Sequence, residues 1–118
     1  MFKVVMLIKK RPELTREAFM DYYTNHHVPF IHELLPKGAA VHRRNFVLEP
    51  NPPGPDDYDV ISEVFYEDRA TAEEAMRAFA DPEIQRLAQE DEDKFILRGS
   101  IRRYVVEVQE TRYRPLPA

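Results

Sequence analysis

The order of the predicted strands and helices constrains the fold of this chain more than any other feature of its sequence. Alternating or β-branched apolar residues predict strands, and apolar residues three and four positions apart predict helices. These patterns predict strands at residues 2–9, 39–49, 58–66 and 100–110, and helical regions at residues 15–35 and 69–95. The resulting β-α-β-β-α-β order predicts an α+β domain with a four-stranded antiparallel sheet.

Prolines subdivide both helical regions. Pro29 is expected to break or kink the first region, and residues 36–38 are expected to end it. Asp81 and Pro82 split the second region into two helices, because proline is favoured at a first helical position. With the helices on one face of the sheet, this is the ferredoxin-like arrangement with a split second helix.

One face of this sheet is expected to need a second cover. The first strand carries Val4 and Met6 on one face and Val5 and Leu7 on the other, so both of its faces are apolar. Helices on one side would leave the other face more apolar than the surface of a soluble monomer usually is. We therefore expect a homodimer that forms through the sheet faces.

Composition and charge narrow the function. The chain has no cysteine, which excludes disulfides, thiolate catalysis and cysteine zinc sites. Its net charge of −4, without a sustained basic stripe, disfavours nucleic-acid binding. It has no apolar run that predicts a membrane span, and its N-terminus is predicted as a strand rather than a signal peptide. We expect one domain at 1–110, an extended C-terminal arm at 111–118 and a cytoplasmic location.

The densest group of chemically useful side chains lies in the first helical region. Phe19, Tyr23 and His27 are four residues apart and share one helix face, and Tyr22 and His26 lie beside them. Histidine titrates near neutral pH, so His27 is the candidate general base, with a helix-capping role as the alternative. Tyr22 and Tyr23 are candidate donors to a carbonyl or enolate oxygen, or else core aromatics. Phe19 and His26 are candidate substrate contacts.

Residues outside this helix complete the candidate site. Asp91 and Glu92 are expected to orient the histidine or return its proton, unless this run of acids is a solvated helix face. Glu63 shares an apolar strand face with Phe65, so it is predicted as a pocket acid or as the partner of an arginine. Phe65 and His42 are candidate substrate contacts, with a polar edge strand as the alternative for His42.

No metal or nucleotide site is expected. His26 and His27 are adjacent and point about 100° apart on a helix, which does not suit one metal ion. The three glycines of the chain are not clustered, so no phosphate-binding loop is predicted. Ligation of haem by His27 stays open, and His32 is predicted at the surface.

Several of these segments together resemble the EthD-like proteins of the dimeric α+β barrel superfamily. The resemblance spans residues 2–106, and its order and spacing are more specific than any one piece. The matching pieces are the opening 2–12, the set Phe19, Tyr22, Tyr23, His27 and Pro29, the strand 63–66, the helix start 81–83, and Asp91-Glu92 followed by Phe95. Two departures are Tyr23, where the family often has tryptophan, and the additional histidine His26.

The resemblance implies a homodimer whose two sheets close a barrel, with a small pocket between the sheet and the helices of each subunit. It implies no single reaction, because the superfamily includes oxygenases, isomerases, dehydratases, cyclases and haem-degrading enzymes. The residues favour a cofactor-free isomerase, dehydratase or cyclase that acts on a small apolar cyclic or aromatic carbonyl compound. The alternatives are a cofactor-independent monooxygenase on aromatic substrates and a non-catalytic ligand- or haem-binding accessory protein.

Overall fold

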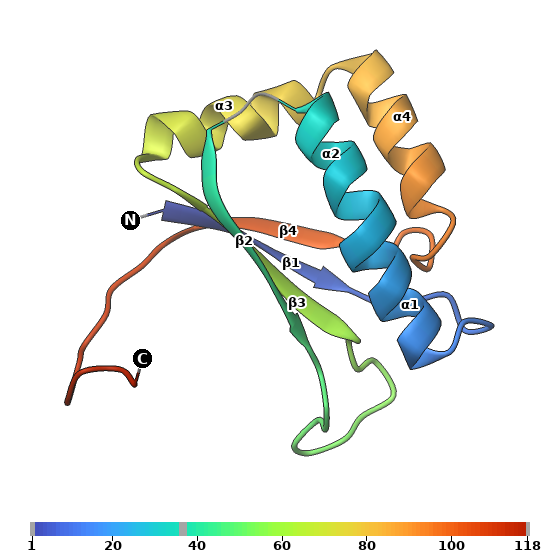
Figure 1. Cartoon of the computed structure of the whole chain (residues 1–118), viewed down its shortest axis with the longest axis horizontal. Coiled ribbons are helices and arrows are strands. Elements are labelled where there is room, and N and C mark those ends of the chain that lie inside the picture. The colour runs from blue at the N-terminus through green and yellow to red at the C-terminus, as the bar shows by residue number, and fades with distance from the viewer. Residues whose placement is uncertain (1, 36–37, 118) are drawn as a thin grey trace.

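A computed structural model of the chain describes residues 2–35 and 38–117 (Figure 1). Its four strands form one sheet in the order β2-β3-β1-β4, and every neighbouring pair is antiparallel. The strands are β1 (Phe2–Ile8), β2 (Ala39–Phe46), β3 (Val60–Tyr66) and β4 (Arg102–Glu107). This topology confirms the ferredoxin-like α+β fold.

The second helical region is split as predicted. It consists of α3 (Arg69–Phe79) and α4 (Pro82–Glu92), and the Asp81 carboxylate caps the start of α4 by accepting from the backbone N–H of Ile84. The third strand begins two residues later than predicted, although the Asp59 backbone still donates to the carbonyl of Ile8 and accepts from the N–H of Val47, each at 2.9 Å. The Asp59 side chain also accepts a hydrogen bond from the backbone N–H of Lys10 at 2.8 Å, which ties the start of β3 to the segment that follows β1.

The first helical region corrects the prediction for Pro29. The chain runs from α1 (Arg16–Tyr22) through a π-helical segment, η1 (Tyr23–His27), directly into α2 (Val28–Leu34). In η1 the Val28 N–H donates to the carbonyl of Tyr23, five residues back instead of four. The wider turn accommodates the proline ring, which would clash with a carbonyl in a regular α-helix, so the helix continues. Pro36 and Lys37, predicted to help end it, lie outside the described residues.

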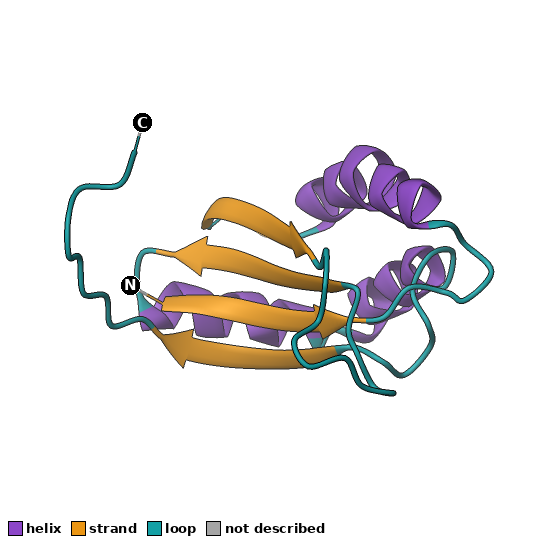
Figure 2. Cartoon of the chain, turned by 90° about the horizontal axis from the view of Figure 1, so that it is seen from below, coloured by secondary structure: helices purple, strands orange, loops and turns teal. Residues whose placement is uncertain are grey.

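The helices lie on one side of the sheet and enclose the core with it (Figures 1 and 2). Ile8 and Val60 contribute from the strands, and Phe19 and Tyr23 contribute from the first helical region. Phe95, which follows α4, is fully buried between Phe19 and Tyr23, with ring centroids 5.8 and 5.3 Å away. The core therefore holds the segment 19–27 firmly against the sheet.

The opposite face of the sheet carries apolar side chains that no described element covers. Val5 and Leu7 lie there beside Ile61 and Tyr104, of which Ile61 is 38% and Tyr104 45% exposed. We call these four residues the open-face patch. After β4, residues 108–117 contain no helix or strand and extend away from the body in both views, and Ala118 lies outside the described residues. None of the described helices is long and apolar enough to cross a membrane.

Candidate active site

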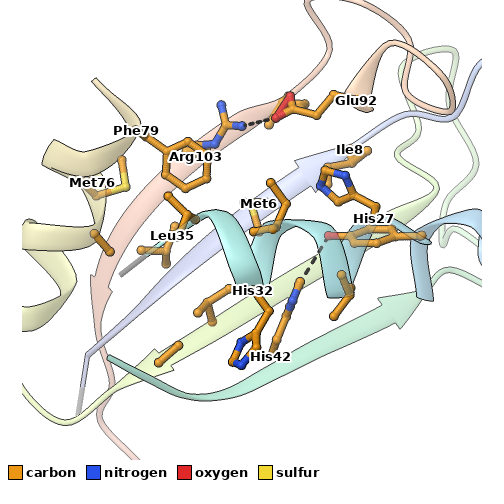
Figure 3. Close-up of a pocket in the computed structure, with 18 of the residues that line it drawn as sticks. Met6, Ile8, His27, His32, Leu35, His42, Met76, Phe79, Glu92 and Arg103 are labelled. Carbon is orange, nitrogen blue, oxygen red and sulfur yellow. Dashed lines mark hydrogen bonds and ion pairs between the residues drawn. The ribbon is translucent and has the colours of Figure 1, made fainter. Parts of the chain in front are cut away.

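A cavity of about 140 Å³ lies between the helices and the helix-facing side of the sheet. Most of its wall is apolar and comes from β1, β3, the helices and the residues next to α2 and β4, with residues such as Val4, Met6, Ile31, Leu35, Val64, Met76, Phe79 and Ile101. Its polar lining consists of Tyr23, Tyr66, His27, His32, His42, Glu92 and Arg103, and the three histidines, Glu92 and Arg103 are labelled in Figure 3. Few polar groups around an apolar space are typical of a small-molecule site.

His27 and Asp91 form a buried pair at this cavity. Nδ1 of His27 lies 2.7 Å from Oδ2 of Asp91, and the Tyr22 hydroxyl donates to the other carboxylate oxygen at 2.6 Å. An ionised carboxylate only accepts, so the imidazole Nδ1 carries the hydrogen of this contact. No described residue hydrogen-bonds Nε2, which leaves its lone pair free on a side chain that lines the cavity.

The environment favours a neutral His27 beside an ionised Asp91. Burial lowers the pKa of His27 and outweighs the opposing effect of Asp91. Burial alone would raise the pKa of Asp91, but the hydrogen bonds from Tyr22 and His27 bring that pKa below its ordinary value. A neutral imidazole oriented by a carboxylate has the properties of a general base.

The two tyrosines have different partners. Tyr23 is buried, and its hydroxyl lies 2.7 Å from Oγ of Ser62 and 3.5 Å from Nε2 of His42. Burial raises the pKa of Tyr23 to about 12. Burial and the hydrogen bond to Asp91 raise the pKa of Tyr22 to about 12 as well. Both hydroxyls therefore stay protonated near neutral pH, Tyr22 as a donor to Asp91 and Tyr23 at the cavity wall.

Glu92 and Arg103 form a second polar pair on the cavity wall. Nη2 of Arg103 donates to Oε1 of Glu92 at 3.1 Å, and the guanidinium lies 5.2 Å from the ring of Phe79. Burial raises the pKa of Glu92 against the opposing charge of Arg103. Arg103 was not predicted as a site residue, although its alternation with Ile101 and Val105 places a charge on an apolar strand face.

The structure brings only some of the predicted residues together. His27, Asp91, Tyr22, Tyr23, Glu92 and His42 lie at or directly behind the cavity. Phe19 is a core residue, with 1% of its surface exposed. His26 stacks on Tyr22 at 5.1 Å with its side chain 59% exposed, so it points away from the cavity.

Glu63 and Phe65 lie on the open face of the sheet, not in the cavity. Glu63 pairs there with Lys3 at 2.7 Å and with Arg43 at 3.6 Å, and Lys3 lies over the Phe65 ring. This is the arginine-pairing alternative for Glu63, with a lysine added. His32 is exposed, as predicted, and it also lines the cavity.

His42 makes the stability of the fold sensitive to pH. Burial, with the charges of Arg44 and His27, lowers its pKa from the ordinary 6.5 to about 4. The folded state therefore binds fewer protons than the unfolded chain, so the stability from neutral His42 is complete above pH 6.5 and is lost as the pH falls toward 4. Between pH 7 and pH 5 we expect a loss of about 2 kcal/mol in the free energy of unfolding.

Denaturant titrations at both pH values measure this loss. The control is His42→Gln, whose free energy of unfolding is expected to fall less over the same interval, because the glutamine does not titrate. Equal losses in the two proteins would show that His42 does not cause the effect.

Comparisons with known proteins agree with this fold. The EthD domain model matches residues 11–99. A crystal structure of an ethyl tert-butyl ether D (EthD) family protein from Bacillus halodurans C-125 is 23% identical, covers 92% of this chain and 99% of that one, and has a TM-score of 0.63. HapK from Hahella chejuensis is 14% identical, covers 98% and 99%, and has a TM-score of 0.60.

A third structure is similar over most of its length. It is a dimeric protein of ferredoxin-like fold from Bacteroides fragilis NCTC 9343, 10% identical, covering 91% of this chain and 95% of that one with a TM-score of 0.50. No curated protein sequence matches the chain. At these identities the solved structures show a shared fold and do not identify a reaction.

Proposed function

This chain belongs to the EthD domain family, and from that membership and the geometry of the cavity we propose that it is a small homodimeric acid–base enzyme. It acts without a cofactor on a small apolar cyclic or aromatic carbonyl compound. The reaction is an isomerisation, a dehydration or a ring closure. The observation that carries this proposal is the free Nε2 of His27 at an apolar cavity, with Asp91 hydrogen-bonded behind the ring.

The reaction begins with a proton transfer from carbon. Nε2 of His27 takes a proton from the carbon next to the carbonyl group, and the electrons of that C–H bond move to the carbonyl oxygen to give an enolate. Asp91 stabilises the resulting imidazolium through Nδ1–H. The proton then returns to another position of the substrate, from His27 itself or from Glu92. Tyr22 holds Asp91 in place, and Tyr23 is available as a donor at the wall.

The size of the cavity supports a substrate of one ring. A cavity of about 150 Å³ lined by apolar side chains holds a benzene molecule, and this one measures about 140 Å³. A porphyrin is several times larger, so the dimensions of this cavity favour a small cyclic substrate over haem.

The homodimer is proposed on two grounds. The open-face patch leaves apolar side chains exposed on one side of the sheet, and a second copy of the same patch would cover them. The similar protein from Bacteroides fragilis is a dimer. We also propose that residues 1–110 form the folded domain and residues 111–118 form its extended arm.

A ligand screen with turnover measurements tests the proposed reaction. Wild type and His27→Ala are screened by thermal shift against cyclic enones, enol-lactones and hydroxylated benzenes, and each hit is followed by absorbance with and without oxygen. We expect to find a ligand that stabilises both proteins. His27→Ala is expected to convert this ligand at least about a hundredfold more slowly than wild type does. His26→Ala, which removes an exposed neighbour, is the matched control.

Each outcome of the screen assigns a function. Equal turnover by His27→Ala would refute the acid–base mechanism and favour a ligand-binding accessory protein. Turnover by wild type that consumes oxygen would identify a cofactor-independent monooxygenase, since the same carbanion can react with dioxygen.

A further inference from the structure

The cavity contains a positive charge that the proton transfer to His27 does not use. Arg103 reaches the cavity from β4, where it lies opposite Met6 of β1 on the helix-facing side of the sheet. A guanidinium among apolar side chains is costly unless its donors find acceptors. The position of Arg103 therefore lowers the stability of the fold.

Most of the donors of Arg103 have no acceptor among the residues that the structure describes. Of its three nitrogens, only Nη2 has a hydrogen-bond partner in the part of the chain that the structure describes, namely Glu92. Nε is buried without a partner, while 29% of the side chain as a whole remains accessible. The ring of Phe79, 5.2 Å away, supports the guanidinium from one face. An arginine placed only to neutralise Glu92 would not need to lie at the cavity with unused donors.

We propose that Arg103 is the oxyanion-binding group of this site, and that it selects a ring compound whose carbonyl oxygen faces the guanidinium while the adjoining carbon faces His27. The inference rests on the proposed function, because the oxyanion forms only when His27 removes the proton. As the C–H electrons move to the carbonyl oxygen, Arg103 donates a charge-assisted hydrogen bond to that oxygen. The proton stays on Nε2 until it is returned, so no oxidant or reductant is required.

His27 and Arg103 are close enough to act on one small molecule. Both line the same cavity of about 140 Å³ (Figure 3). The charge of Arg103 also contributes to the lowered pKa of His27, behind the larger effect of burial. We therefore expect a single-ring ligand in this space to reach both groups.

Glu92 differs from its neighbour Asp91 in a way that fits this assignment. The pKa of Asp91 is lowered, since the hydrogen bonds from Tyr22 and His27 outweigh its burial, whereas burial raises the pKa of Glu92. Neighbouring carboxyl groups with opposite shifts are typical of sites in which one group orients and the other carries a proton. Glu92 is thus positioned beside Arg103 as an acid that reprotonates the substrate, after which the proton held on Nε2 of His27 restores the Glu92 acid.

Binding of 4-nitrophenol tests the role of Arg103 without any turnover. Its phenolate resembles a planar enolate and absorbs visible light, so the bound charge state can be read directly. We expect wild type to bind the phenolate about tenfold or more tightly than Arg103→Gln does. Nitrobenzene, which has the same ring and no anionic oxygen, is expected to bind both proteins equally. Arg103→Lys keeps the charge and is expected to recover part of the phenolate affinity.

Arg102→Gln is the matched control, because Arg102 precedes Arg103 on β4 and lies on the opposite face of the sheet. The proposal is overturned if wild type has no preference for the phenolate, or if Arg103→Gln retains it. If Arg103→Gln loses nitrobenzene binding as much as phenolate binding, the substitution has damaged the cavity. If it loses only the binding of 4-nitrobenzoate, the site recognises carboxylates. Either result contradicts the proposal. Wild type could prefer the phenolate while His27→Ala keeps full turnover. That result would contradict the proposed acid–base reaction but not the binding role of Arg103.

Discussion

Replacing Asp91 by asparagine is expected to lower turnover by about 10³- to 10⁴-fold with little change in structure. The Tyr22 hydroxyl donates to Oδ1, so the asparagine places its carbonyl oxygen toward Tyr22 and its NH₂ group toward His27. Nδ1 must then accept a hydrogen bond, the ring proton moves to Nε2, and the lone pair needed at the cavity is lost. Steady-state kinetics on a substrate from the screen would measure the loss.

A second substitution is expected to restore part of this activity. In the double variant Asp91→Asn, Tyr22→Phe the amide is free to turn and present its oxygen to Nδ1, so Nε2 regains its lone pair. Asp93→Asn serves as the control, because Asp93 pairs with Arg98 on the surface at 2.6 Å and does not line the cavity. Activity in Asp91→Asn near the wild-type level would contradict the assigned role of Asp91 as the group that sets the tautomer of His27.

Replacing Ile61 by arginine is expected to weaken dimer formation by about a thousandfold, or about 4 kcal/mol. Ile61 belongs to the open-face patch and is 38% exposed in one protomer, so the arginine fits the monomer. In a dimer formed through the sheet faces the new charge would be buried without a partner. Sedimentation velocity over a range of concentrations would show the shift toward monomer.

Leu48→Arg separates this effect from a general change in charge. Leu48 is 88% exposed and follows β2 outside the strand, so the same kind of substitution there is expected to leave the dimer intact. The cavity lies on the helix-facing side of the sheet, opposite the open-face patch, so the monomeric Ile61→Arg protein is expected to retain ligand binding. A dimer unchanged by Ile61→Arg would mean that the copies associate through another surface.

The fold could be predicted from the sequence because local patterns and global topology agree. Alternation in 2–9 and 58–66 and the split at Pro82 each lead to the observed elements within a few residues. The exception is Pro29, where the general tendency of proline to end a helix was applied to a helix that widens instead. Backbone hydrogen bonding five residues apart has no simple sequence pattern, so this turn was not predicted.

The candidate site was less predictable because it depends on contacts between distant segments. The stripe of Tyr23 and His27 indicated a pocket wall, and Asp91 was a candidate partner of His27. Only the fold shows that His27 and Asp91, 64 residues apart in the sequence, form a hydrogen-bonded pair. Glu63, on an apolar strand, and Glu92, within a run of acids, were both predicted as possible site acids. Strand register separates them, because it places Glu63 on the open face beside Lys3, whereas the end of α4 carries Glu92 to the cavity.

The π-helical segment η1 gives the molecule a way to re-aim its base without rebuilding its core. The wide turn holds one residue more than an α-turn, so deleting one residue within 23–27 would restore an ordinary α-helical repeat and leave the side chains of α1 and α2 on the faces they occupy now. Phe19 would keep its contacts, and only side chains within the turn itself would take new directions. A single-codon deletion or insertion at this turn is thus a short evolutionary route between relatives that share a scaffold and differ in chemistry.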